Sequence, residues 1–370
     1  MKREATETRR QPKTLLIAID TPYNKTTDIE SYYEEFENLV QSNGLAYEDI
    51  ITLTLRDIDP TTFIGKGKLQ EIHKECEKLG IEQVIISEPL TGKQERNLED
   101  ILKCDVIDRT LLILEIFEKA AVSAEGKLQV EIALFQHKKS RLAGRGIFLS
   151  QQEGRIGTRG PGETAKEVAA RHLEEYIRRA KRQLEQLQKV RETQRKQRLT
   201  NRIPHICIIG YTNAGKSTIL NALTKANVLA EDKLFATLDT TTRELYINGK
   251  KKGVISDTVG FIQNLPHQLI DAFKSTLSEL KYADLLLHVV DVSDKGWESH
   301  ISIVHEVLEE LDVEKPMLYV FNKADKVSIT PNLAYAIDGY KPNVIVSAQQ
   351  KDGLKALVNF LANWQPEPEA

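Results

Sequence analysis

Short apolar runs alternate with amphipathic stretches along the first third of the chain. Residues 15–19, 50–55, 84–86 and 105–107 are apolar enough for buried strands, and residues 29–39, 65–79, 98–102 and 108–121 have helical spacing. Strands that alternate with helices in this way pair in parallel through helical crossovers. The pattern predicts an N-terminal parallel α/β subdomain over residues 12–122.

Residues 123–202 follow a helical pattern without strands. One apolar face is formed by Leu128, Ile132, Leu134, Phe135 and Leu142. Beyond a glycine-rich segment, a coiled-coil-like seam steps by four and three through Leu173, Ile177, Ala180, Leu184 and Leu187. The pattern predicts an antiparallel helical hairpin that forms a long arm, with a tip loop over residues 143–163.

The predicted tip loop is dense in glycine and arginine. Long loops without secondary structure inside a domain are usually functional or disordered. Arginines beside bare glycine backbone suit structured RNA, whose phosphates and splayed bases are contacted closely. We therefore favour RNA contact over a simple linker, and the candidate residues are Arg141, Arg145, Arg155 and Arg159.

The apolar run 203–209 leads into a phosphate-loop motif. Residues 210–217 read Gly-Tyr-Thr-Asn-Ala-Gly-Lys-Ser, and an amphipathic helix begins directly after them. Successive backbone N–H groups of such a loop face a phosphate chain, Lys216 reaches the β- and γ-phosphates, and Ser217 ligates Mg²⁺. The candidate nucleotide-binding residues are Gly210, Tyr211, Thr212, Asn213, Ala214, Gly215, Lys216, Ser217 and Thr218.

Three further motifs follow apolar runs in the order that a guanine-nucleotide switch needs. Asp257 and Gly260 form D-x-x-G, in which the carboxylate holds Mg²⁺ through water and the glycine N–H senses the γ-phosphate. In Asn322-Lys323-Ala324-Asp325, the last carboxylate can accept guanine N1–H and N2–H₂, which adenine cannot offer. Ser347-Ala348 places a backbone N–H for guanine O6. The four motifs predict a Ras-like GTPase domain over residues 203–365.

Two positions of this domain bear on the rate of hydrolysis. A switch loop needs a threonine over Mg²⁺ and the γ-phosphate, for which Thr237 is our choice and Thr240–Thr242 are competitors. Phe261 stands where Ras-like enzymes carry a water-positioning glutamine, which predicts slow turnover without a partner. As a hypothesis, Asn213 helps to hold a K⁺ that supplies the missing charge.

Composition adds that the chain is an ordinary globular protein. It has 370 residues, of which 41% are hydrophobic and 28% charged, and a net charge of -3. Its three cysteines are widely spaced beside apolar runs, so we expect buried, reduced thiols rather than disulfides or a metal site. No run is long enough for a membrane span, and the first ten residues lack a signal-peptide core. We expect a cytoplasmic monomer.

These motifs together resemble the HflX family of the Obg–HflX group of GTPases. The GTPase motifs are widely shared, whereas the more specific matches lie upstream, at residues 64–68, 108–110, 113–117, 125–131 and 157–164. The sequence departs from the family pattern at residues 165–171, where a Leu-Glu-x-Asp-Arg-Arg-like stretch is usual.

The resemblance implies an N-terminal α/β subdomain, a helical arm and a Ras-like domain that binds GTP or GDP with Mg²⁺. It implies binding to the large ribosomal subunit, stimulation of GTP hydrolysis by that subunit, and splitting or rescue of stalled ribosomes under stress. The tip would then reach ribosomal RNA near the peptidyl-transferase centre. The family's nucleotide roles fall on Lys216, Ser217, Thr237, Asp257, Gly260, Asn322 and Asp325.

Two alternatives remain open on the sequence. The protein could be an RNA-binding scaffold that uses GTP only as a stability ligand, because base recognition does not demonstrate turnover. The N-terminal subdomain could also carry an ATP-dependent RNA-remodelling activity, which rests only on Gly65-Lys66-Gly67-Lys68 at a predicted helix start.

Overall fold

The structure is a computed structural model that describes residues 10–24, 28–142, 165–200, 203–224, 234–235, 238, 241–263 and 277–366. The chain divides into two compact units, one around a four-stranded sheet and one around a six-stranded sheet, and residues of both arm helices belong to each unit. The mixed α/β class expected from the sequence is confirmed.

The first sheet is entirely parallel, with strand order β2-β1-β3-β4. Its central strand consists almost wholly of buried Leu, Ile and Ala side chains, because helices cover both faces of a parallel sheet. Leu16 pairs with Ile50 on one side and with Ile85 on the other. The strands are β1 (Thr14–Asp20), β2 (Asp49–Thr54), β3 (Gln83–Ile86) and β4 (Asp105–Ile107).

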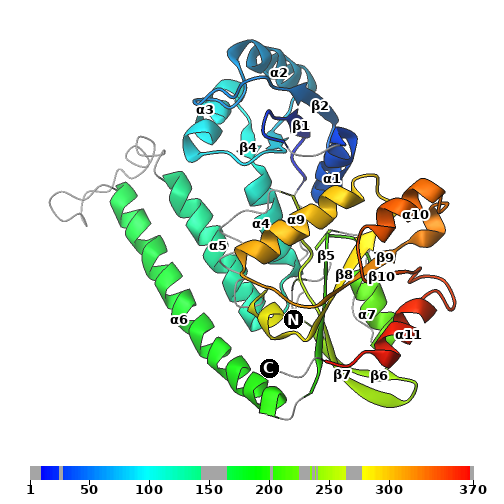
Figure 1. The fold of residues 1–370 in the computed structure, drawn as a ribbon. Coiled ribbons are helices and arrows are strands. Elements are labelled where there is room, and N and C mark those ends of the chain that lie inside the picture. Colours follow the sequence, from blue (N-terminus) through cyan, green and yellow to red (C-terminus); the bar gives the residue numbers. More distant parts are fainter. Residues whose placement is uncertain are drawn as a thin grey trace, which may run out of the picture. The chain divides into compact units, whose positions relative to one another are not determined.

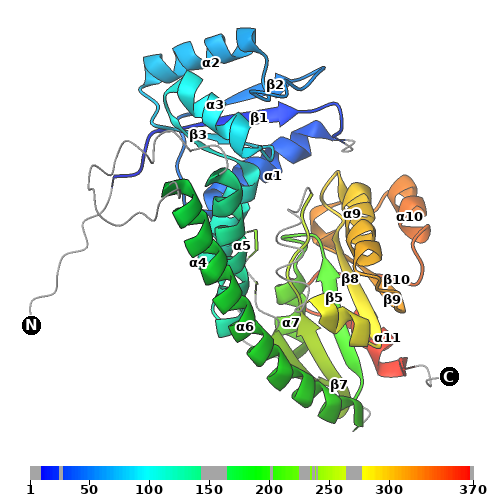
Figure 2. The same ribbon diagram turned by 90° about the vertical axis from the view of Figure 1, so that its left-hand side faces the viewer.

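Helices connect these strands, and Figure 2 shows two of them on one face of the sheet, α2 and α3, with α1 on the other. The helix predicted at 98–102 begins earlier, because Thr91 and Gln94 form a capping box that starts it at Gly92. The helices are α1 (Ile29–Ser42), α2 (Lys66–Leu79), α3 (Gly92–Leu102) and α4 (Arg109–Ala120).

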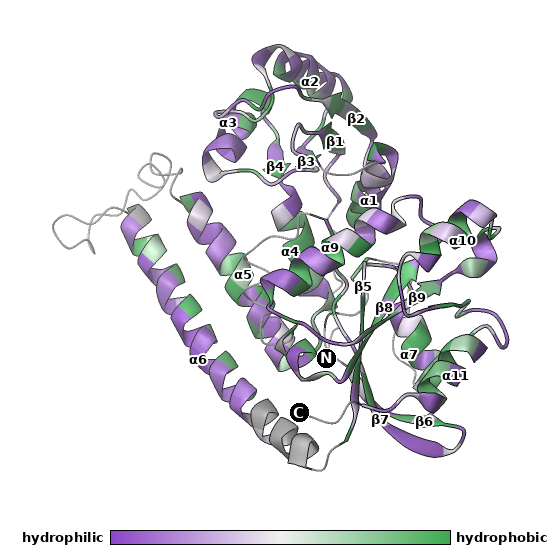
Figure 3. Ribbon diagram, viewed as in Figure 1, coloured by the Kyte–Doolittle hydropathy of each residue, from purple (hydrophilic) through white to green (hydrophobic). Residues whose placement is uncertain are grey.

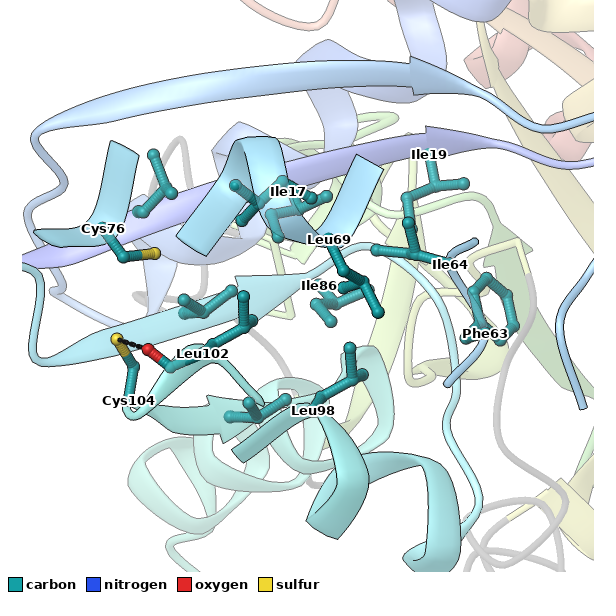
Figure 4. Close-up of a cluster of buried hydrophobic side chains, with 14 of the residues drawn as sticks. Ile17, Ile19, Phe63, Ile64, Leu69, Cys76, Ile86, Leu98, Leu102 and Cys104 are labelled. Carbon is teal, nitrogen blue, oxygen red and sulfur yellow. Dashed lines mark hydrogen bonds between the residues drawn. The ribbon is translucent and has the colours of Figure 1, made fainter. Parts of the chain in front are cut away.

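A single apolar cluster fills the space between this sheet and the helices α2 and α3. In Figure 4, Leu69 of α2 and Leu98 of α3 point toward Ile17 and Ile86 of the sheet. Cys76 and Cys104 belong to the same cluster as buried thiols, and Cys207 is likewise buried; none of the three forms a disulfide. The expectation of reduced cysteines therefore agrees with the structure.

The arm consists of two long helices, α5 (Ala124–Leu142) and α6 (Ala165–Thr200). Phe135 packs against Tyr176 with ring centroids 5.0 Å apart, and Lys139 pairs with Glu174 over 2.6 Å. Residue numbers rise along one helix as they fall along the other, so the two helices pair antiparallel as predicted. The predicted seam residues are among the less exposed of the α6 residues whose side chains are described, and the coloured part of the helix is mostly hydrophilic (Figure 3).

The second sheet has strand order β10-β9-β8-β5-β7-β6, and all neighbours are parallel except β6 and β7. Figure 1 shows β6 and β7 projecting as a hairpin. The sequence did not predict this hairpin. The strands are β5 (His205–Gly210), β6 (Thr241–Ile247), β7 (Lys250–Asp257), β8 (Leu285–Asp291), β9 (Met317–Asn322) and β10 (Asn343–Ile345).

Helices cover both faces of the second sheet. The apolar cluster on one face includes Ile219 of α7 and Leu357 of α11, and the cluster on the other includes Ile301 of α9 and Ile337 of α10. These elements are α7 (Lys216–Thr224), α9 (Trp297–Glu310), α10 (Pro331–Asp338) and α11 (Lys355–Asn363), with 3₁₀ turns η1 (Ser278–Tyr282) and η2 (Ala324–Lys326). Within the described part of the chain, no helix has the length and apolarity to cross a bilayer.

Candidate guanine-nucleotide site

The predicted motifs meet at the carboxyl edge of the second sheet. Strand β5 ends at Gly210, β7 at Asp257, β8 at Asp291 and β9 at Asn322, and these four strands are parallel neighbours. Parallel strands bring their carboxyl ends to one edge, where open α/β sheets bind ligands. The topology therefore gathers segments that lie more than a hundred residues apart in the sequence.

Lys216 is the first residue of α7, and its ammonium lies inside the phosphate loop. Its Nζ donates to the carbonyl oxygen of Tyr211 over 2.7 Å and to that of Gly210 over 3.2 Å. Burial lowers the pKa of Lys216 to about 8, and the nearby charge of Lys323 adds to this effect. A phosphate anion next to the ammonium would raise this pKa again, as expected for a phosphate-binding lysine.

Ser217 and Asp257 lie within hydrogen-bond distance, as the magnesium prediction requires. The Ser217 Oγ donates to Asp257 Oδ2 over 2.6 Å, and Asp257 is fully buried. The following residue is also fixed, because Thr258 Oγ1 donates to the carbonyl oxygen of Ile208 over 2.8 Å. A hydroxyl and a carboxylate from two different elements converge here, and this oxygen donor set is one that Mg²⁺ accepts.

Asn322 joins the phosphate loop to the loop that carries Ser347 and Ala348. Its Nδ2 donates to the carbonyl oxygen of Ala214 over 2.9 Å, and its Oδ1 accepts from the N–H of Ala348 over 3.0 Å. Gly215 is required beside it, because a Cβ at that position would lie 2.3 Å from Asn322 Nδ2 and the backbone φ is +94°. The Ala348 N–H can therefore meet guanine O6 only by sharing or exchanging its bond to Asn322.

Asp325 is exposed, and the Ser347 hydroxyl donates a hydrogen bond to its Oδ1. This bond lowers the pKa of Asp325 below its usual value, so the carboxylate stays ionised and is held in one orientation. Lys323, in a left-handed conformation, pairs with Asp291 over 2.6 Å. The sequence did not predict a role for Asp291, although its position at the end of an apolar run could have identified it.

The D-x-x-G segment lies against the phosphate loop. Thr212 N–H donates to the carbonyl oxygen of Phe261 over 2.7 Å, and Phe261 N–H donates to that of Gly210 over 3.1 Å. Phe261 is only 2% exposed. A Cβ on Gly260 would lie 2.9 Å from Lys216 Nζ and 2.9 Å from Thr212 Cγ2, so glycine alone allows this approach.

Some predicted residues lie outside the described part of the chain. These are Thr237 and Thr240, together with Arg145, Arg155 and Arg159. Of the other competitors for the magnesium-capping role, Thr241 and Thr242 lie on β6, and Thr242 Oγ1 is 2.8 Å from Ser256 Oγ. Thr242 is thus engaged in a cross-strand contact.

Arg141 corrects one expectation from the sequence. Its guanidinium is paired with Glu95 over 2.7 Å and Asp108 over 2.6 Å, and it donates to the carbonyl oxygen of Leu90 over 2.6 Å. The side chain is 11% exposed. Against the effect of burial, hydrogen bonding from His137 and the Arg141 charge hold the pKa of Asp108 below its usual value. Arg141 therefore anchors the end of α5 rather than offering its charge to RNA.

The Gly65–Lys68 motif begins α2, as predicted for a strand-to-helix turn. Gly65 is the N-cap and makes no side-chain capping bond, and Lys68 pairs with Glu71 over 3.1 Å. This is an ordinary exposed helix start. It gives no independent support for a second nucleotide site.

A mostly parallel sheet with a phosphate loop, a D-x-x-G strand end and an Asn-Lys-x-Asp turn defines a P-loop GTPase. Three family models match successive parts of the chain: GTP-binding GTPase N-terminal at residues 30–118, GTP-binding GTPase Middle Region at 120–198 and 50S ribosome-binding GTPase at 205–323. The matches cover the α/β subdomain, the arm and most of the nucleotide domain.

Curated relatives give the family. GTPase HflX of Caldanaerobacter subterraneus subsp. tengcongensis is 44% identical over 354 residues, which cover 95% of this chain and 80% of that protein. GTPase HflX of Escherichia coli (strain K12) is 42% identical over 341 residues, covering 92% and 80%. The crystal structure of SsGBP with GDP is similar at 27% identity and a TM-score of 0.51, covering 95% of this chain and 97% of that one.

The chain belongs to the GTPase HflX family. It is therefore an enzyme that binds guanine nucleotide and hydrolyses GTP. Family membership favours turnover over the scaffold alternative, in which GTP would serve only as a stability ligand.

Proposed function

We propose that this GTPase binds the large ribosomal subunit in its GTP-bound state and splits or rescues stalled ribosomes, and that the ribosome stimulates its slow intrinsic turnover. The proposal is carried by the match of residues 205–323 to a 50S ribosome-binding GTPase. Relatives that match along nearly all of this chain are members of the same family.

The nucleotide site supports the dependence on a partner. The residue after Gly260 is Phe261, a buried phenyl ring whose backbone is bonded to the phosphate loop. A phenyl ring has no donor or acceptor with which to orient an attacking water. At this position the protein therefore lacks the group that Ras-like enzymes use, and the ribosome is the proposed source of the missing contribution.

Mg²⁺ is the metal that the site suits. Ser217 Oγ and Asp257 Oδ2 would hold it, the first directly and the second through water, and Thr237 is the proposed third contact. When bound with the nucleotide, the ion neutralises charge on the β- and γ-phosphates. Lys216 contributes a second positive charge from within the phosphate loop.

K⁺ is a further proposed ligand. Asn213 is exposed in the phosphate loop and has a φ of 58°, a left-handed conformation that asparagine tolerates. The residue thus stands at the rim of the loop, and its side-chain oxygen is the proposed ligand for the monovalent cation. Such an ion would supply positive charge to the transition state in place of an arginine finger.

The proposed RNA contact is confined to the tip. Arg141 forms ion pairs with Asp108 and Glu95, so the remaining candidates for RNA contact are Arg145, Arg155 and Arg159. The exposed basic residues of α6, such as Arg178 and Lys181, lie along the helix that leads away from this loop. They add positive charge to the same arm.

Sedimentation through sucrose gradients with each ribosomal subunit and non-hydrolysable GTP tests the proposal, together with phosphate release. We expect co-sedimentation with large subunits and faster release in their presence. Replacing Arg155 and Arg159 by Ala should weaken binding to the large subunit. It should also make the slope of log binding constant against log salt concentration shallower by roughly two. Replacing exposed Lys295 and Lys351 is the charge-matched control. Absence of both binding and stimulation in the wild-type protein would overturn the proposal.

A further inference from the structure

Tyr211 makes more contacts than a phosphate-loop residue needs for binding phosphate. Its carbonyl oxygen holds the Lys216 ammonium, and its backbone forms a parallel bridge with Phe261. Its side chain is 6% exposed, and its hydroxyl accepts a hydrogen bond from the N–H of Gln263 over 2.9 Å. One residue therefore contacts both the phosphate-binding lysine and the start of the segment after D-x-x-G.

The ring of Tyr211 is itself held in place. It stacks on the imidazole of His300 in α9, with ring centroids 3.8 Å apart and planes at 7°. Stacking over a full ring face removes rotational freedom from the tyrosine. The hydroxyl is therefore presented to Gln263 in a fixed direction, at little further entropic cost.

The position of Gly260 shows what this arrangement excludes. A Cβ on Gly260 would lie 2.9 Å from Lys216 Nζ and 3.0 Å from Thr212 Cα. A γ-phosphate must lie between such a lysine and the glycine N–H, because it contacts both. Since even a methyl group at Gly260 would collide with the ammonium, entry of the larger γ-phosphate calls for residues 260–263 to move outward.

Thr212 of the phosphate loop also lies against Gly260. Thr212 Oγ1 is buried without a hydrogen-bond partner, while its methyl group faces Gly260. Residues 260–263 are held in this position by contacts with the phosphate loop. The contacts available are the backbone bonds to Phe261 and the side-chain bond from Tyr211 to Gln263.

We propose that Tyr211 is a positioning residue that sets the preference between GDP and GTP, by holding residues 260–263 over the place of the γ-phosphate. GDP binds without disturbing this contact, since it has no γ-phosphate. GTP must break the bond between the Tyr211 hydroxyl and Gln263. This preference requires only guanine-nucleotide binding and not the ribosome.

Tyr211→Phe tests it, because this variant keeps the ring that stacks on His300 and removes the hydroxyl that accepts from Gln263. Dissociation constants for fluorescent GDP and for a non-hydrolysable GTP analogue are measured with Mg²⁺ and without ribosomes. We expect GTP-analogue affinity to rise about fivefold relative to GDP affinity, the value of one hydrogen bond. Equal changes for both nucleotides, no change, or a loss confined to the GTP analogue would each overturn the proposal.

A second pair of variants acts on the ring. His300→Ala removes the stack and should shift the GTP-to-GDP ratio in the same direction, whereas His300→Phe retains an aromatic face and should behave as wild type. Hydrogen exchange of the Gln263 amide gives a separate readout. Exchange should quicken in Tyr211→Phe with GDP bound, and unchanged protection would count against the proposed hydrogen bond.

Discussion

Ser217 donates a hydrogen bond from its hydroxyl to the buried carboxylate of Asp257 over 2.6 Å. The two residues belong to different elements, the first turn of α7 and the last position of β7. A hydroxyl held against a carboxylate in this way can be taken over by a cation without large movement of either side chain. The pair is therefore the most direct structural support for Mg²⁺ in the site.

Ser217→Ala should lower the Mg²⁺ dependence of nucleotide binding while leaving the fold intact. The variant removes a ligand oxygen, so metal affinity should fall at least about tenfold, as for other losses around metal sites. The measurement is GDP affinity with excess Mg²⁺ and with chelator. Ser302→Ala is the control, since its hydroxyl donates to the Glu298 carbonyl within α9. An undiminished chelator effect in Ser217→Ala would exclude this serine as a ligand.

Asp325→Asn should change the choice of base. An amide cannot accept both guanine N1–H and N2–H₂, and a site that loses such a match discriminates strongly, so guanine affinity should drop more than about a hundredfold. Xanthosine nucleotides should bind better than to wild type. The measurement is competition between guanosine and xanthosine diphosphates, with exposed Asp352→Asn as the matched control. Retained guanine preference would refute the base-recognition role.

The sequence predicted strands β5, β7 and β9 of this site, because each leads into a motif with its own spacing, but it did not predict β8, which leads into none. It could not predict contacts between motifs, such as Asn322 with Ala214 or Tyr211 with His300, because these depend on which strands become neighbours. It also misjudged Arg141. A basic residue beside a glycine-rich loop is typical of an RNA contact, and only the fold reveals Asp108 and Glu95 around it.

The hypothesis of K⁺ assistance predicts that GTP hydrolysis is faster in KCl than in NaCl at equal ionic strength. Asn213→Ala should remove the difference and slow turnover, because the side-chain oxygen is the proposed ligand. Its exposed position favours a normal fold in the variant. Asn248→Ala is a matched control that should keep the salt preference, because Asn248 is also exposed and left-handed, with a φ of 51°, in the turn between β6 and β7. Equal rates in the two salts for the wild-type protein would refute K⁺ assistance.

The lowered pKa of Lys216 predicts how nucleotide binding depends on pH. Burial lowers its pKa to about 8 in the nucleotide-free protein, and bound phosphates should raise it again. At a pH between the pKa of Lys216 in the free protein and its pKa in the complex, Lys216 is protonated in the complex and deprotonated in the free protein. Binding should therefore take up a proton above pH 8. The association constant should then fall as pH rises, with a limiting slope of roughly tenfold per pH unit. Below about pH 7 the lysine is charged in both states, and the dependence should vanish.

Calorimetric titration with GDP in two buffers of different ionisation enthalpy measures this uptake directly. Lys216→Arg is the control, because a guanidinium stays protonated throughout the range and cannot take up a proton. Any proton exchange by the guanine base is common to both proteins and cancels in the comparison. We expect uptake near pH 8.5 for wild type that is absent in Lys216→Arg. Equal uptake in the two proteins would show that the ammonium already carries its full charge before the phosphates arrive.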